Sequence, residues 1–158
     1  MYRLKQVILS TLALFSAVTY AANQQQVDKI LDLNSAPAGV AFEIMEGSQD
    51  TLAPLLKEVE LYNQQLKEKF PEIKTAVLTH GSEQFALLKE QPNQQAVEQS
   101  LSLTNNDIEV HVCGTHASWY GKTEDDFLGH VNVAKSAVEQ VAEFKALGYE
   151  VIRLRYNY

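Results

Sequence analysis

Cysteine, glycine and proline are all scarce in this chain, and each shortage excludes a class of protein. One cysteine among 158 residues excludes a disulfide framework and a zinc module built on paired cysteines. With 7 glycines, 4 prolines and 46% hydrophobic residues, the chain is neither fibrous nor disordered. A chain of this length and composition is expected to form one globular domain.

Positive charge is scarce as well. The 13 Lys and Arg residues stand against 20 Asp and Glu residues, which gives a formal net charge of −7. Nucleic-acid affinity comes largely from Lys and Arg contacts to phosphate, so we expect no nucleic-acid partner. The GxGxxG and Walker phosphate loops and the GxSxG nucleophile motif are also absent from the sequence. Nucleotide binding and serine-hydrolase chemistry therefore have no support.

The amino terminus carries an apolar run. Residues 7–18 (VILSTLALFSAV) follow Arg3 and Lys5 and are followed by small residues. This layout is typical of a secretory signal peptide, and the run is shorter than the roughly 20 residues of a membrane-spanning helix. We therefore predict a signal peptide over residues 1–21, cleavage after Ala21, a periplasmic location and no membrane contact after cleavage. Loss of the two basic residues would change the net charge from −7 to −9. An uncleaved anchor is the alternative.

Beyond the amino terminus, short apolar runs typical of strands alternate with segments of helical spacing. The expected strands cover residues 40–45, 73–79, 108–112, 131–133 and 149–154. The expected helices cover residues 51–70, 83–89, 94–101 and 134–147, with a further helix start at 123–126. This alternation predicts an α/β fold in which helices cover both faces of a parallel sheet. We expect residues 22–37 to be a polar leader and residues 38–158 to form the single domain.

Polar or reactive residues follow three of the expected strands. The first strand leads to Glu46, the second to His80 and the third to Cys113. In an open parallel sheet, ligands bind outside the carboxyl ends of the strands. These three residues are therefore expected at one edge of the sheet, which is the candidate site.

Cys113 is the strongest candidate for chemistry. It precedes Gly114 and Thr115, where the chain is expected to turn into a short helix whose N–H groups favour an ionised thiol. His116 lies three residues further on, and His111 lies two residues back on the same strand face. A protonated histidine nearby would favour the thiolate further. The alternative is a small buried hydrophobic residue without chemistry.

His80 is the second candidate, as an acid, a base or an orienting group across from the cysteine; a capping or solvent-facing role is the alternative. Glu43 and Glu46 are carboxylates expected near the same edge. The cysteine and histidines suit zinc or copper by ligand type, but their spacing matches no strong metal motif. We therefore assign no metal and no cofactor.

Several blocks, taken together, resemble the DsrE/DsrF-like family of small sulfur-handling proteins. These blocks are VAFEIMEG from Val40, TAVLTHG from Thr75, IEVHVCG from Ile108, GKTEDD from Gly121 and GYEVIRL from Gly148. The resemblance covers residues 38–155, nearly the whole chain after the signal peptide. It implies a three-layer α/β/α sandwich with a mainly parallel five-stranded sheet. It also implies a homo-oligomer, which would be a dimer, a trimer or a hexamer.

In sulfur-relay members of this family, a cysteine in this loop region accepts sulfur as a persulfide and passes it on. The resemblance thus implies a sulfur carrier or sulfurtransferase with a donor or acceptor protein as partner. The predicted signal peptide would place it in the periplasm, unlike the cytoplasmic relay members of the family. The resemblance assigns this role to Cys113 alone. From their expected positions near the cysteine, His116 and His80 are the further catalytic candidates, and Gly114, Thr115, Glu46 and His111 are the binding candidates. Two alternatives stay open: a non-catalytic oligomeric binding protein with a buried cysteine, and a Cys/His metal site in the same pocket.

Overall fold

The computed structural model describes residues 21–156. Its five strands form one sheet in the order β4-β3-β2-β1-β5, and every neighbouring pair is parallel. The strands are β1 (Gly39–Ile44), β2 (Lys74–Thr79), β3 (Glu109–Cys113), β4 (Asn132–Ala134) and β5 (Tyr149–Leu154). The parallel five-stranded sheet expected from the sequence is therefore confirmed.

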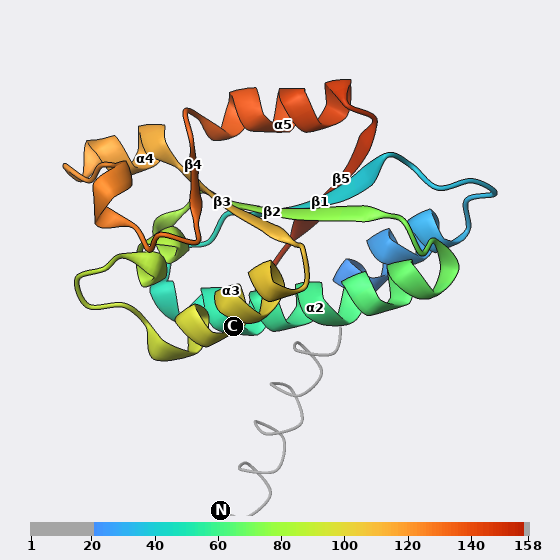
Figure 1. Ribbon diagram of the computed structural model, residues 1–158, viewed down its shortest axis with the longest axis horizontal. Helices are drawn as coiled ribbons and strands as arrows, with labels where there is room; N and C mark the ends of the chain where they lie inside the picture. Colours follow the sequence, from blue (N-terminus) through green and yellow to red (C-terminus); the bar gives the residue numbers. More distant parts are fainter. Residues whose placement is uncertain (1–20, 157–158) are drawn as a thin grey trace, which may run out of the picture.

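Helices cover both faces of this sheet, as Figure 1 shows. The α-helices are α2 (Leu52–Lys69), α3 (Gln94–Asn105), α4 (Gly114–Trp119) and α5 (Ala137–Ala146). The short 3₁₀ helices are η1 (Gln49–Thr51), η2 (Ser82–Leu87) and η3 (Glu124–Asp126). The longer helices α2 and α3 lie side by side on one face, and α5 lies on the other (Figure 1). The fold is thus the three-layer α/β/α sandwich that the sequence analysis expected.

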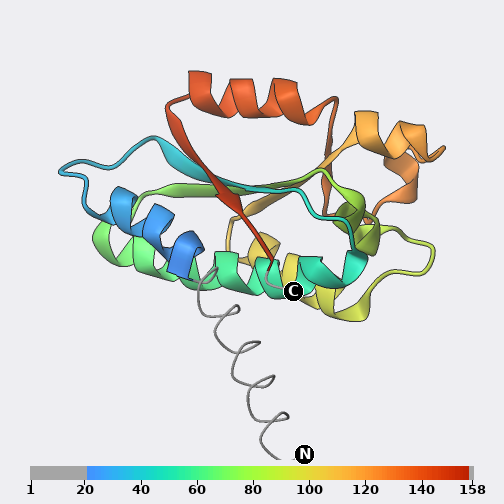
Figure 2. The same ribbon diagram turned by 180° about the vertical axis from the view of Figure 1, so that it is seen from behind.

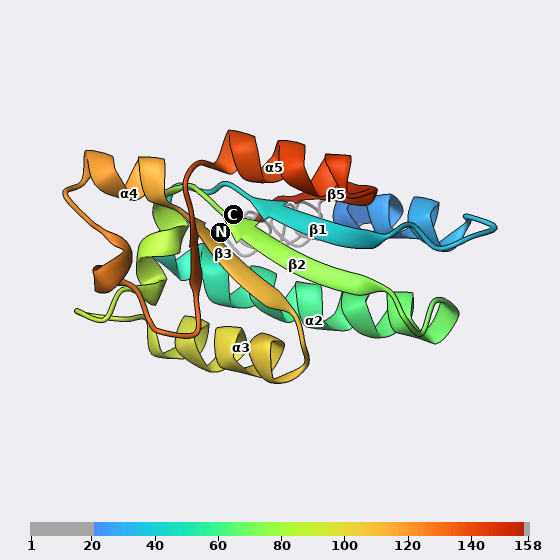
Figure 3. The same ribbon diagram turned by 45° about the horizontal axis from the view of Figure 1, so that its top comes forward.

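The chain crosses the sheet from one edge to the other between β4 and β5. Because these two strands are at opposite edges, the chain passes through α5, on the face opposite α2 and α3, to reach β5 (Figure 3). This crossing makes β1 the neighbour of both β2 and β5. As a result, the carboxyl ends of elements far apart in the sequence lie close together.

The two faces of the sheet carry cores of unequal size. The larger core fills the space between the sheet and α2 and α3, and includes Phe42, Leu56 and Tyr62. The smaller core, under α5, consists of Ala41, Ala76, Leu78, Cys113, Ala137 and Phe144. Small side chains dominate this second core, so α5 can lie close to the strands. The candidate cysteine belongs to this thinner layer.

Residues 21–31 are helical and lie beside α2 (Figure 2), and all but residue 21 belong to the segment expected as a polar leader over residues 22–37. Val27 and Ile30 are buried in the larger core. The Asn23 amide donates to Glu58 and to the carbonyl of Arg155, and its oxygen accepts from the Arg155 N–H. This segment is therefore anchored to both α2 and the end of β5.

The predicted signal peptide lies, up to residue 20, outside the described residues. Within residues 21–156, no helix combines the length and the apolar character needed to cross a membrane.

Two connections near the candidate site differ from the sequence prediction. The segment expected as a helix over residues 83–89 is the 3₁₀ helix η2, which begins at Ser82 and ends at Leu87. The helix expected from residue 134 begins at Ala137, because Ser136 caps it and residue 134 still pairs in β4. The later start of α5 leaves residues 135 and 136 non-helical between β4 and α5.

Candidate functional site

Cys113 is the last residue of β3 and the N-cap of α4. Its Sγ accepts the backbone N–H of His116 at 3.4 Å, and its own N–H donates to Gln84 Oε1 at 2.7 Å. The residue is only 5% exposed. Local sequence explains the turn, because Gly114 packs against β4 near the Ala134 carbonyl, where a larger residue would be crowded.

The Cys113 side chain lines a cavity of about 380 Å³ at the carboxyl ends of β1, β2 and β3. His80, His116 and Thr115 line the same cavity. The cysteine is thus nearly buried but faces an open space. The structure brings together the three residues that the sequence analysis named as catalytic, and one of the four that it named as binding residues.

His116 is held in one tautomer by the neighbouring strand. Its Nδ1 lies 2.7 Å from the carbonyl oxygen of His80. Because a carbonyl only accepts, Nδ1 must carry the proton, and Nε2 is then the acceptor of the neutral ring. The rings of Phe85, Trp119 and Tyr120 surround this imidazole with centroids 5.3–5.5 Å away. Nε2 is therefore the ring nitrogen at which His116, a residue that lines the cavity, can accept a proton.

His80 is paired with Glu43, a carboxylate that the sequence predicted only to lie near the same edge of the sheet. Its Nε2 lies 2.9 Å from Glu43 Oε1. The guanidinium of Arg153 donates to both oxygens of Glu43, at 3.0 and 2.9 Å. The sheet makes this possible, because Glu43 and Arg153 are register partners on β1 and β5. The three side chains form a row across three neighbouring strands.

The neighbouring side chains of His80 and Arg153 favour the charged form of Glu43. Burial raises the pKa of the Glu43 carboxyl, but the hydrogen bonds and charges of Arg153 and His80 outweigh burial and bring its pKa below the usual value. The same bonds to Glu43 raise the pKa of Arg153 above its usual value. An ionised Glu43 accepts from Nε2–H of His80, which leaves Nδ1 as the acceptor of the neutral imidazole.

A buried carboxylate fixes the backbone on which His80 stands. Glu83 is fully buried, and its oxygens accept from the N–H groups of His80, Gly81 and Glu46 and from the Thr79 hydroxyl. A Cβ on Gly81 would overlap the Glu46 carbonyl and the Glu83 carboxylate. Only glycine therefore fits after His80, and the carboxyl ends of β1 and β2 are held together.

Three residues expected in the site do not line the cavity. His111 lies two residues before Cys113 on β3, and its Nε2 pairs with Glu109 at 2.9 Å. Glu46 accepts the backbone N–H of Tyr156 at 3.0 Å, at the end of β5. Gly114 serves the turn against β4. Strand geometry explains His111, because two residues along a strand displace a side chain by about 7 Å.

Sequence reasoning missed Arg153 and Gln84 at this site. Arg153 was recognised only as part of the last strand, and its spacing from Glu43 of 110 residues hides the pairing. Gln84 is fully buried and binds the backbone of Cys113, while its Nε2 has no hydrogen-bond partner among the described residues. The signal for Arg153 was present: opposite charges in two predicted strands.

The described residues provide no set of side chains that could bind a metal ion. Among residues 21–156, no three His, Cys, Asp or Glu side chains come together in a way that would hold a metal ion.

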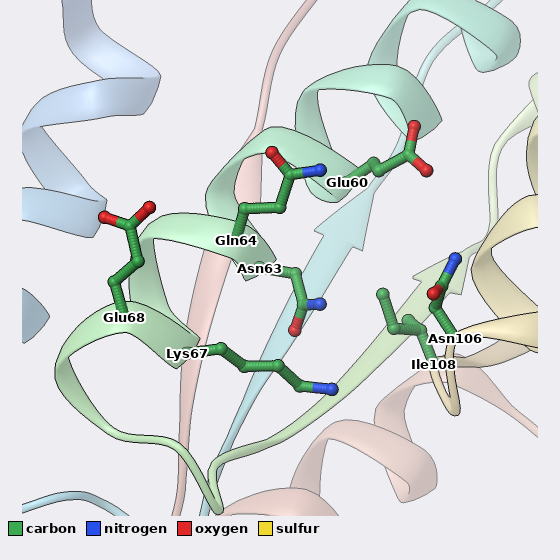
Figure 4. Close-up of a pocket in the computed structure, with 7 residues that line it drawn as sticks. All are labelled: Glu60, Asn63, Gln64, Lys67, Glu68, Asn106 and Ile108. Carbon is green, nitrogen blue, oxygen red and sulfur yellow. The ribbon is translucent and has the colours of Figure 1, made fainter.

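A larger cavity of about 490 Å³ lies at the other end of the sheet (Figure 4). Its lining residues come mainly from α2 and from the turn before β3: Glu60, Asn63, Gln64, Lys67, Glu68, Asn106 and Ile108. This wall mixes both signs of charge and contains no cysteine, serine or histidine. Ligands of open parallel sheets bind at the carboxyl ends of the strands, so we assign the candidate site to the smaller cavity beside Cys113.

Comparison with known proteins gives support for the fold only. No family model matches this sequence, and no curated protein matches it. Among solved structures, the chain is similar to the protein of unknown function MTH1491 from Methanobacterium thermoautotrophicum. The TM-score is 0.59 at 21% identity, over 72% of this chain and 96% of that chain. At this identity the similarity concerns the fold and not the chemistry.

Proposed function

We propose that this protein is a DsrE-like sulfur-relay protein that carries sulfur as a persulfide on Cys113. The observation that supports this most is that the only cysteine of the chain lines a cavity together with His80 and His116. A nucleophile with two groups that can move protons, at the carboxyl ends of parallel strands, is an arrangement suited to group transfer.

The proposed reaction is an exchange at sulfur that needs no oxidant. The Cys113 thiolate attacks the outer sulfur of a persulfide donor, R–S–SH, and a new S–S bond forms. The S–S bond of the donor breaks, and R–S⁻ leaves with the electron pair and takes up a proton. Cys113 then holds the outer sulfur as Cys–S–SH and passes it to an acceptor thiolate in the same way.

The neighbouring groups have separate tasks in this scheme. The backbone N–H of His116 donates to Cys113 Sγ, and such a hydrogen bond is stronger when the sulfur is ionised. Nε2 of His116 accepts the thiol proton, because Nδ1 is occupied by the His80 carbonyl. Glu43 holds the ring of His80 beside the cavity. His80 and His116 thus serve proton transfer to and from the reacting sulfur.

The proposal places the protein in the periplasm as a homo-oligomer that exchanges sulfur with a partner protein. The amino-terminal apolar run and the family resemblance support this part of the proposal. The donor and acceptor would then differ from those of cytoplasmic relay proteins.

Intact mass spectrometry of the full protein, after incubation with a polysulfide donor, tests the central claim. We expect the wild type to gain one sulfur and Cys113→Ser to gain none. No gain in the wild type, or an equal gain in the serine variant, would count against a persulfide carrier.

The histidines are tested by the rate of this loading. We expect His80→Gln and His116→Gln to slow it by about ten- to a hundredfold, since general acid–base groups contribute factors of this size or larger. His130→Gln is the matched control, because His130 lies in the turn before β4 and pairs with Ser100 instead of lining the cavity. Equal loading rates in all three variants would contradict the proposed proton transfer by His80 and His116.

A non-catalytic binding protein is the second candidate. The low exposure of Cys113 and its place in the smaller core favour this alternative. A thiol-reactive dye separates the two: labelling of the native protein supports the relay, whereas labelling only after unfolding supports the binding protein.

A further inference from the structure

We propose that the cavity beside Cys113 selects sulfur donors whose organic part is apolar and uncharged, such as a small alkyl or aryl persulfide, over anionic donors. This inference rests on the proposed function and names the substrate class of the same site. The composition of the cavity wall supports this inference.

Apolar side chains form the outer part of the wall and are unusually exposed. Met45 follows β1, Trp119 ends α4 and Val138 lies in the first turn of α5, and all three line the cavity. They are 50%, 75% and 82% exposed. Large apolar groups this exposed, gathered from three separate elements around one opening, mark a surface that gains stability when an apolar group covers it. Its volume is near the lower end for small-molecule sites, so the organic part must be small.

Permanently charged cationic side chains are missing from the wall. None of the described residues that line the cavity is Lys or Arg. Arg153 already binds both oxygens of Glu43, and Lys135, next to the cavity residue Ser136, pairs with Glu139 at 3.3 Å. A protonated His80 would likewise face the Glu43 carboxylate.

An anionic donor would therefore lose water without gaining a Lys or Arg partner, and the positive charge that His116 gains with the thiol proton is balanced by the Cys113 thiolate in the same cavity. Desolvation of a charged group is costly unless an opposite charge or hydrogen bonds replace the water. The net charge of −7 adds a general repulsion of anions. A neutral organic group suffers neither penalty and contacts Met45, Trp119 and Val138.

The chemistry is the exchange already described, with R as the apolar group. The Cys113 thiolate takes the outer sulfur of R–S–SH, the donor S–S bond breaks, and R–S⁻ leaves and is protonated to R–SH. The R group lies against the apolar wall while the reacting sulfur points to Cys113. Recognition of the donor is thus separate from the group-transfer step.

Loading rates with two probes test the inference. Benzyl persulfide and glutathione persulfide are supplied at equal concentration to the full protein, and each rate is divided by the rate with a free small thiol in solution. This division removes the intrinsic reactivity of each donor. We expect the normalised rate to favour benzyl persulfide by about tenfold or more, the size of a moderate pocket preference.

Two lysine substitutions on α5 provide the matched comparison. Val138→Lys places a cation in the wall and should shift the preference toward glutathione persulfide by about tenfold. Leu147→Lys adds the same charge at the other end of the helix, where Leu147 is 60% exposed and does not line the cavity, and should leave the preference unchanged.

The outcomes separate this inference from the proposed function. Equal normalised rates in the wild type, or equal effects of the two lysine variants, overturn the selection of an apolar donor while loading of Cys113 still stands. Absence of loading by either donor overturns the persulfide carrier itself.

Discussion

Glu43 organises the histidine end of the site at the scale of single residues. One carboxylate binds the imidazole of His80 on β2 and the guanidinium of Arg153 on β5. It is largely buried, and its oxygens are paired on both sides. A partly buried carboxylate with two cationic or proton-donating partners orients a histidine well, because the histidine has one ring nitrogen occupied and one available.

Glu43→Gln tests this residue through the pH dependence of stability. The replacement keeps the shape and removes the charge, so we expect the free energy of unfolding to fall by about 0.5–1 kcal/mol at neutral pH. The pKa of Glu43 is lowered in the fold. The charged form therefore adds stability above the usual carboxyl pKa of about 4.3, and this stability is lost as the pH falls through the lower folded pKa.

Urea unfolding of the wild type and the Gln variant at several pH values measures this. The difference between their free energies of unfolding should be largest near neutral pH and should become smaller in acid. A difference that stays constant down to about pH 3, well below the usual carboxyl pKa, would contradict the ionised pair.

At the scale of elements, the carboxyl ends of β1 and β2 are joined by the start of η2. Glu83 is the first-turn acid of η2, yet it binds the backbone that leaves both strands. The neighbouring end of β3 is tied in by Gln84, the next residue of η2. One short 3₁₀ helix thus connects the ends of three strands, and these strand ends frame the cavity.

Glu83→Gln tests this connection. The variant exchanges a buried charge with four donors for an amide that can accept at only one atom, and its own N–H groups would face other donors. We expect the free energy of unfolding to fall by about 2–4 kcal/mol. Glu90→Gln, at an exposed carboxylate just beyond η2, should change it by less than about 0.5 kcal/mol.

Chemical denaturation at neutral pH measures both variants. A loss in Glu83→Gln no larger than that in Glu90→Gln would show that the buried carboxylate does not hold the strand ends together.

At the scale of the whole molecule, the sheet order and the amino-terminal helix close the structure. The path through α5 brings the last strand beside the first. The helical segment over residues 21–31 then bridges α2 and the end of β5 through Asn23. Cleavage after Ala21, as predicted, would keep this bridge in the remaining chain.

Asn23→Ala tests the bridge between the two ends of the described chain. The side chain is almost fully buried and makes hydrogen bonds to Glu58 and to both backbone groups of Arg155. Its loss removes three hydrogen bonds, two of them to the backbone of Arg155, so we expect a loss of about 1–3 kcal/mol. Asn34→Ala, at an exposed position in the following loop, is the control and should change stability by less than about 0.5 kcal/mol. An equal unfolding temperature in Asn23→Ala and Asn34→Ala would contradict the anchoring role of Asn23.

The sequence by itself determined the succession of strands and helices and the position of Cys113 at a strand end. The last strand was predicted over residues 149–154 and is observed there, and the first was predicted within one residue of β1. These features are local, because a few consecutive side chains alternate between buried and exposed faces of the same element. The placement of His80 near Cys113 followed from the parallel arrangement, which the alternation of elements implies.

Only the tertiary structure decided which side chains meet. The pairing of Glu43 with Arg153 depends on β5 lying beside β1, and the bond from Gln84 to Cys113 depends on how η2 turns between two strands. The burial of Asn23, Val27 and Ile30 requires α2 and the end of β5 to be in place. Sheet order and long-range packing join residues far apart in the chain, so no local pattern in the sequence carries them.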